Sequence, residues 1–299
     1  MASSRGSFLS GRIGAALRLT LSVAVLALLW VWLDGATILR RLVAAQPGWV
    51  ALAILGVQAQ TIASAWRWRL TAEALGRPLR MGRAVREYYV AGLLNMTLPG
   101  GVAGDAARIA RGRDADGWRA AAAPVVVERL AGQIAMWLLA SLGLALSPLM
   151  LGAPVWVAVA GAVAAAGGAG GAALGARRAG GGVRGLLHRA WVADGAWRAQ
   201  VVLSPAIAAS YVAVFILCAR ALGHELPLGA ALTVVPLTLL AMTLPLSVGG
   251  WGLREGAAAA LWPLAELMAA DGVAAAALYG LVCLAGALPG AVFLWSRPA

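Results

Sequence analysis

The sequence MTLPGGVAGDAAR (Met96–Arg108) returns later in the chain, in altered form, as MTLPLSVGGWGLR (Met242–Arg254). The two stretches agree at seven of their thirteen positions, among them the proline and the closing arginine. Proline and consecutive glycines interrupt helices, because proline lacks a backbone N–H and glycine adopts conformations that other residues avoid. The same break, followed by the same arginine, therefore occurs twice in this chain.

The composition is that of a membrane protein. Hydrophobic residues make up 62% of the 299 residues and charged residues 12%, about half the charged share of a soluble domain. Several apolar runs are long enough to cross a hydrocarbon core, which takes about 20 helical residues. We therefore predict an all-α, polytopic bundle of transmembrane helices that forms a single integral membrane domain over residues 1–299.

The net charge of +12 comes from arginine alone, because the chain contains no lysine. We assign this excess to cytoplasmic loops rather than to nucleic-acid binding. The cysteines, Cys218 and Cys283, lie in apolar runs and predict neither a disulfide nor a metal site. The histidines, His188 and His224, belong to no recognisable catalytic constellation. We expect no cofactor, no metal and no enzymatic activity.

The apolar runs and the loop charges together predict the topology. Short cytoplasmic loops collect basic residues, so the arginine-rich segments 67–87 and 177–199 are placed on the cytoplasmic side, together with both termini. About six to eight spans then cross a bacterial inner (cytoplasmic) membrane. The apolar runs lie roughly at 19–33, 49–65, 84–98, 120–147, 154–176, 200–222, 230–246, 255–265 and 273–295.

The segments around the two breaks do not fit full crossings. The residues after the first break are too polar to cross, so segment 84–119 is predicted to enter from the cytoplasmic side, break at Pro99-Gly100-Gly101 and return. Segment 230–265 starts and ends on the opposite side, as a second re-entrant hairpin or as two tilted spans. Inverted repeats whose broken helices meet near the membrane midplane recur in transporters. We favour such a repeat over two simple kinks or loops.

The charged residues beside the breaks indicate anion binding. A half-helix that starts after the glycines directs free backbone N–H groups into the membrane, and arginine binds phosphate bidentately. Arg108 and Arg254 therefore form a predicted phosphate path, with Asp105 and Glu255 as ion-pair partners, contacts for a substrate amine, or proton carriers. In the alternative interpretation, Asp105 caps a helix and Arg254–Glu255 is a structural pair.

Further polar residues lie inside the apolar runs. Glu128 and Arg129, near the start of the fourth run, are interpreted as a structural ion pair at the interface or as part of the cavity lining. Gln58, Gln60 and Gln133 fit hydrogen bonds between helices better than contacts to a ligand.

Three stretches of the chain resemble a known family. LLNMTLPGGVAGDAARIARGRD, VVERLAG and LPLSVGGWGLREGAAAAL are similar, in order and spacing, to the transmembrane domain of lysylphosphatidylglycerol synthases, a flippase-like family of integral membrane proteins. The resemblance covers about residues 10–296. This chain departs mildly from the family, with Glu128 where Asp is frequent and Ala103 in a turn that commonly reads Gly-Gly-Asp. The family pattern falls here on Asn95, Pro99, Gly100, Gly101, Gly104, Asp105, Arg108, Glu128, Arg129, Pro245, Gly249, Gly250, Gly252, Arg254 and Glu255.

The resemblance implies a function in lipid handling. Family members that are fused to an aminoacyl-transferase domain make aminoacylated phosphatidylglycerol, and their membrane part moves it between leaflets. For this stand-alone chain the resemblance implies translocation of an anionic or aminoacylated phospholipid, or of a polyprenyl-phosphate or hopanoid-type lipid. The expected partners are membrane lipids and enzymes of lipid biosynthesis. The alternative is a membrane-embedded transferase or an accessory subunit in the synthesis of a lipid or lipid-linked glycan.

Overall fold

The computed structural model describes residues 3–113, 117–163, 166–167, 180–192, 196–244 and 246–294. Within these ranges the regular elements are helices, and the only strand-type pairing is an isolated antiparallel bridge between Pro99 and Val248. The predicted all-α membrane bundle is confirmed. Pro245 and residues 177–179 and 193–195 of the predicted loop 177–199 lie outside the described residues.

Four described helices are long and apolar enough to cross a membrane: α3 (Pro47–Ala74), α6 (Gly117–Leu151), α9 (Ala196–Ala221) and α12 (Ala269–Ala287). A fifth candidate joins α1 (Ser3–Trp32) to α2 (Gly35–Val43) across a bend of 94°. The predicted run at 154–176 is described as helix at 155–163 and 166–167. The count of four or five spans thus refers to the described part of the chain, and the sequence-based count of six to eight includes this run.

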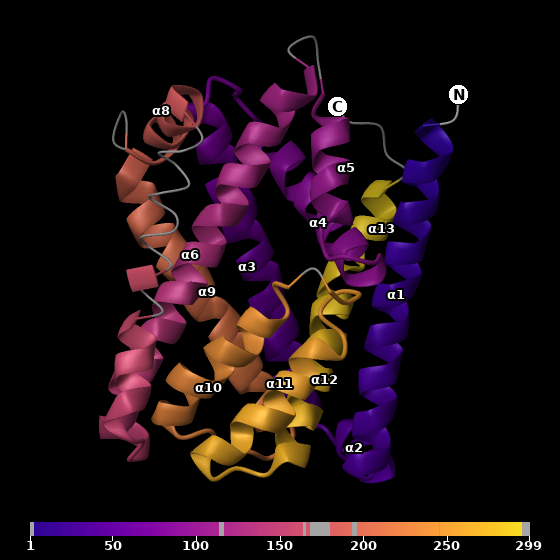
Figure 1. Cartoon of the computed structure of the whole chain (residues 1–299), viewed down its shortest axis with the longest axis vertical. Helices are drawn as coiled ribbons and strands as arrows, with labels where there is room; N and C mark the ends of the chain where they lie inside the picture. Colours follow the sequence, from indigo (N-terminus) through magenta and orange to yellow (C-terminus); the bar gives the residue numbers. More distant parts are fainter. Residues whose placement is uncertain are drawn as a thin grey trace.

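Two pairs of shorter helices take the place of full crossings. The first pair, α4 (Met81–Thr97) and α5 (Ala103–Arg111), lies in the same half of the bundle as α8 (Gly180–Trp191). The second pair, α10 (Leu228–Ala241) and α11 (Leu253–Leu261), lies in the opposite half, which also holds α2 (Figure 1). Each pair turns back near the middle of the bundle. Segment 230–265 is therefore a hairpin, completed by the 3-10 helix Trp262–Ala265, rather than two tilted spans.

The turns of the two hairpins contact each other. The backbone N–H of Gly100 donates to the carbonyl oxygen of Ser247 at 3.0 Å. Gly100 and Gly249 have φ angles of 96° and 56°, a region that favours glycine. At Gly249 a Cβ would lie 2.6 Å from the backbone oxygen of Met96, so the close approach of the turns also requires a residue without a side chain. The duplicated motif thus forms the junction between the two halves of the bundle.

The long helices pack around this junction on an apolar core. The core contains four side chains that are each at most 1% exposed: Phe215 of α9, Val235 of α10, Trp262 of the 3-10 helix and Tyr279 of α12. The Phe215 ring lies 5.5 Å from the Tyr279 ring and 6.4 Å from the Trp262 ring, centroid to centroid. α13 (Pro289–Leu294) follows α12 and packs on α4. The core therefore fixes α9 and α12 as the wall against which the second hairpin rests.

The segment 67–87, predicted as a cytoplasmic loop, is mostly helical. α3 continues to Ala74 and α4 begins at Met81. Arg67 and Glu87 consequently lie inside helices and are each 4% exposed. Their charges are offset by ion pairs to side chains of other elements, Glu128 and Arg111, which the loop interpretation did not consider.

Candidate functional site

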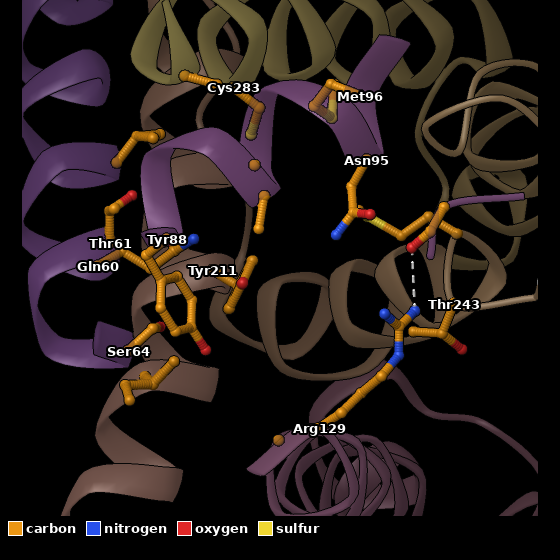
Figure 2. Close-up of a pocket in the computed structure, with 18 of the residues that line it drawn as sticks. Gln60, Thr61, Ser64, Tyr88, Asn95, Met96, Arg129, Tyr211, Thr243 and Cys283 are labelled. Atoms are coloured by element: carbon orange, nitrogen blue, oxygen red, sulfur yellow. Dashed lines mark hydrogen bonds between the residues drawn. The ribbon is translucent and has the colours of Figure 1, made fainter. Parts of the chain in front are cut away.

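A cavity of about 320 Å³ lies between the two hairpins and the long helices beside them. Both motif turns line it, the first through Gly101 and the second through Gly249 and Gly250. The spans α3, α6, α9 and α12 supply the rest of its wall. Polar side chains face it from two sides, with Gln60, Thr61 and Ser64 across from Asn95 and Arg129 (Figure 2).

Three arginines and two carboxylates form one continuous set of ion pairs on this wall. Arg67 Nη2 donates to Glu128 Oε1 at 2.5 Å, and Glu128 Oε2 lies 3.6 Å from Arg108 Nη2. Arg108 Nη2 also donates to Asp105 Oδ1 at 2.5 Å, and Arg129 Nη1 pairs with Asp105 Oδ2. Three cations against two anions leave this cluster, hereafter the arginine cluster, with a formal charge of +1.

The arginine cluster is buried, and some of its donors have no partner. The side chains of Arg67, Arg108 and Glu128 are 4–5% exposed, whereas that of Arg129 is 33% exposed. Arg67 Nε and two nitrogens of Arg108, Nε and Nη1, make no hydrogen bond within the described residues. Buried donors without partners are costly, so an anion that enters the cavity and accepts these hydrogen bonds would be stabilised there.

Aromatic rings hold the central arginine in place. The Arg108 guanidinium carbon lies 4.5 Å from the Tyr88 ring centroid and 4.9 Å from the Trp68 ring centroid. A ring face attracts a cation without accepting a conventional hydrogen bond. Tyr88 and Trp68 therefore hold the guanidinium without using its N–H groups, of which those on Nε and Nη1 have no partner within the described residues.

The first motif is built so that α5 can start beside the cavity. The side-chain oxygen of Asn95 accepts a hydrogen bond from Gly104 N at 2.7 Å, which satisfies one of the amides that a helix start leaves free. A Cβ at Gly104 would collide with the backbone of Ala91, so α5 and α4 approach each other closely. Asp105 makes no capping bond, because α5 follows Val102 without a side-chain cap. The capping alternative for Asp105 is therefore wrong, and its carboxylate is an ion-pair partner.

The second motif has a similar composition but a closed environment. Arg254 donates through Nη2 and Nε to Glu255 Oε1, at 2.6 and 3.1 Å, and Glu255 Oε2 accepts from Gly252 N at 2.7 Å. Arg254 and Glu255 are 0% exposed. The guanidinium lies between the rings of Trp251 and Tyr279, 5.0 and 5.4 Å from their centroids. Of these residues Tyr279 lines the cavity, so Arg254 lies behind the cavity wall.

The structure brings the predicted residues of both motifs to one place. Some line the cavity, namely Asn95, Gly101, Asp105, Arg108, Glu128, Arg129, Gly249 and Gly250. Others form the junction or the two half-helix starts next to it, namely Pro99, Gly100, Gly104, Gly252, Arg254 and Glu255. The predicted residue Pro245 lies outside the described residues.

The sequence interpretation assigned Gln60 to a hydrogen bond between helices and overlooked the other polar residues on the same face of α3. Gln60, Ser64, Arg67 and Thr71 follow one another at spacings of four, three and four residues, which places them on one face of a helix. All four are at most 7% exposed. A polar stripe at helical spacing in an otherwise apolar segment was the available signal, and it marks a buried polar face rather than a loop.

The comparison with known families agrees with these motifs. A family model described as the lysylphosphatidylglycerol synthase TM region matches residues 17–290. The chain therefore belongs to this family of multi-pass membrane proteins, and membership connects it with a membrane-lipid function. No curated protein matches the chain.

Proposed function

From this family membership and the arginine cluster, we propose that the protein moves a lipid with an anionic headgroup between the two leaflets of a membrane. The headgroup enters the cavity, and the acyl or polyprenyl chains stay in the bilayer. The observation that carries the proposal is a buried cluster at the cavity with three arginines, two carboxylates and unused guanidinium donors.

The chemistry of the cluster favours a phosphate-bearing headgroup. Ionisable groups at membrane depth are expensive and are retained chiefly for function, and the surplus positive charge is balanced when one monoanion binds. Guanidinium groups match phosphate oxygens in geometry and charge. A cavity of about 320 Å³ lies at the small end of ligand-binding pockets, which suits a headgroup and leaves the hydrocarbon chains outside.

The surroundings of the cavity suit a lipid that is only partly enclosed. The first turn carries Leu98 and Val102, which are 42% and 45% exposed, and the second carries Leu244 and Leu246, both 50% exposed. These apolar side chains flank the breaks that line the cavity. They offer hydrocarbon chains a surface while the headgroup contacts Arg129, the most exposed member of the arginine cluster.

The alternative of a membrane-embedded transferase has less support. Such an enzyme needs an acid or a base that is free to exchange a proton with the substrate, and Asp105, Glu128 and Glu255 were the candidates. Each of their six carboxylate oxygens faces an arginine nitrogen or a backbone N–H. These contacts favour a role as counterions. The protein is therefore proposed to change the leaflet of its lipid and not its mass.

The proposed orientation of the protein in the membrane rests on the distribution of its arginines. The end of the bundle at which α1 begins also holds α8 and the connection between α3 and α4 (Figure 1). Arginine-rich connections face the cytoplasm. We propose that this end is cytoplasmic, in a bacterial inner membrane, and that the cavity receives lipid there.

The test is leaflet exchange in liposomes that contain the purified protein. Fluorescent phosphatidylglycerol is followed by dithionite quenching, with Arg108→Ala and Arg67→Ala compared with Arg119→Ala, a matched arginine at the exposed start of α6. We expect exchange in the parent and in Arg119→Ala, and its loss in the two cavity variants. The proposal fails if the folded cavity variants exchange lipid at the parental rate, or if mass spectrometry shows that the protein converts the lipid.

A further inference from the structure

The two copies of the motif place their arginines in matching surroundings. Arg108 and Arg254 each occupy the ninth position after the proline of their motif. Each guanidinium pairs with a carboxylate from the same helix and lies against two aromatic rings. Arg108 lines the open cavity, whereas Arg254 is 0% exposed. The repeat is therefore chemically similar and differs in access.

One side chain, that of Tyr279, contacts both the Arg254 guanidinium and the cavity. Tyr279 of α12 lines the cavity and also presents its ring to the Arg254 guanidinium, 5.4 Å from ring centroid to guanidinium carbon. Its hydroxyl is buried and has no oxygen or nitrogen hydrogen-bond partner in the described part of the chain. The ring is thus held by packing on Phe215 and on the cation, and its hydroxyl lies beside the Cys283 thiol.

Arg254 retains the capacity to bind an anion. Glu255 occupies its Nε and Nη2, and Nη1 is buried without a partner among the described residues. The neighbouring Gly280 has no room for a Cβ, because one would collide with Arg254 Nη2. The α12 backbone therefore lies directly against the guanidinium, and Tyr279, which precedes Gly280, presents its ring to the same guanidinium and to the cavity.

We propose that Arg254 is a second anion-binding site and that Tyr279 is the residue that closes it off from the cavity. This inference rests on the proposed lipid translocation. A phosphate held by the arginine cluster would reach Arg254 Nη1 when the Tyr279 ring turns aside, and so pass from the first half of the bundle to the second.

Arginine modification by phenylglyoxal tests the site without any transport measurement. The purified protein is placed in vesicles of phosphatidylcholine or phosphatidylglycerol, treated with phenylglyoxal and analysed by peptide mass spectrometry. Exposed Arg198 serves as the internal standard for full reactivity. We expect Arg254 to resist modification in the parent and in Tyr279→Phe, which keeps the ring, and to react like Arg198 in Tyr279→Ala. Phosphatidylglycerol should then protect Arg254 in Tyr279→Ala, and phosphatidylcholine should not.

Transport supplies the second measurement. Arg254→Gln leaves Glu255 buried and unpaired, so the double variant Arg254→Gln/Glu255→Gln is made as well, because it removes both charges together. We expect both to keep phosphatidylglycerol bound at the arginine cluster and to lose exchange. The proposal is overturned if Arg254 stays unreactive in folded Tyr279→Ala, if phosphatidylglycerol does not protect it there, or if the folded double variant exchanges lipid at the parental rate.

The two proposals fail in different ways. If the parent protein moves no lipid, the translocation proposal falls, while the phenylglyoxal experiment still decides whether a shielded anion site exists at Arg254. If the parent moves lipid and Arg254 is neither shielded by Tyr279 nor protected by phosphatidylglycerol, translocation stands and the second site falls.

Discussion

Replacing Glu128 by glutamine should weaken the fold and strengthen anion binding at the same time. Glu128 is 3% exposed and lies between Arg67 and Arg108, at 2.5 and 3.6 Å. Removing one partner of a buried ion pair costs about 3–5 kcal/mol. The amide of glutamine can still accept a hydrogen bond from Arg67, so we expect a loss at the lower end, about 3 kcal/mol. In a thermal unfolding experiment this corresponds to a Tm lowered by roughly 6–12 °C.

The same substitution changes the formal charge of the arginine cluster from +1 to +2. A carboxylate about 6 Å from a bound phosphate repels it by about 3 kcal/mol at an effective dielectric constant of about 20. If half of that repulsion is relieved, phosphatidylglycerol binds about tenfold more tightly. The assay is the rise in Tm on titration with phosphatidylglycerol in detergent, since a ligand of the folded state stabilises it in proportion to RT ln(1 + [L]/Kd).

Glu87→Gln is the matched control for Glu128→Gln. Glu87 is 4% exposed and is paired with Arg111 at 2.9 Å, and it does not line the cavity. The Glu87→Gln substitution should lower Tm by a similar amount and leave the affinity for phosphatidylglycerol unchanged. Equal gains in affinity for both variants, or no gain for Glu128→Gln, would refute the assignment of the arginine cluster as the anion site.

Three further predictions concern the junction, the first motif and the outer end of the bundle. Gly249→Ala should lower Tm and abolish lipid exchange, because Gly249 has a positive φ angle and a Cβ there would lie 2.6 Å from the Met96 backbone oxygen. The control is Gly82→Ala in α4, whose Cβ meets no atom within 4 Å; it should leave Tm and lipid exchange unchanged. Asn95→Ala removes the acceptor of an α5 amide and should cost about 1 kcal/mol, measured as a lower Tm. Asp271→Asn breaks the ion pair that ties α12 to an arginine of α2, and faster hydrogen exchange in α2 with unchanged exchange in α6 is the expected result.

The sequence predicts the arrangement of helices and breaks in the membrane domain, because this arrangement depends on short stretches of the chain. Helix breaks follow from proline and glycine, and the side of each loop is expected from its arginines. In the structure Asn95 serves the broken backbone, because its side-chain oxygen accepts a hydrogen bond from Gly104 N. The length of α3 was misjudged, because Arg67 was taken as the start of a loop. The burial of Arg67 is offset by its ion pair with Glu128, which lies 61 positions further along the chain.

The roles of the two arginines could not be predicted from the motif that they share. Arg108 and Arg254 occupy equivalent positions in the two copies of the motif. Arg108 nevertheless lines the cavity, whereas Arg254 lies behind its wall. The difference comes from residues outside the repeat: α3 brings Arg67 to the first arginine, and α12 brings the ring of Tyr279 to the second.

An added cation makes the first site net positive, whereas at the second site one of the two aromatic rings, that of Tyr279, also lines the cavity. A duplicated sequence can thus specify two anion sites, while the helices packed on each copy decide which one is open. If that reasoning holds, exchanging the motif segments between the two positions should leave access unchanged, because access belongs to α3 and α12. In such a swapped chain, phenylglyoxal should still modify the arginine at position 108 before the one at position 254. The reverse order would mean that access is encoded within the motif itself.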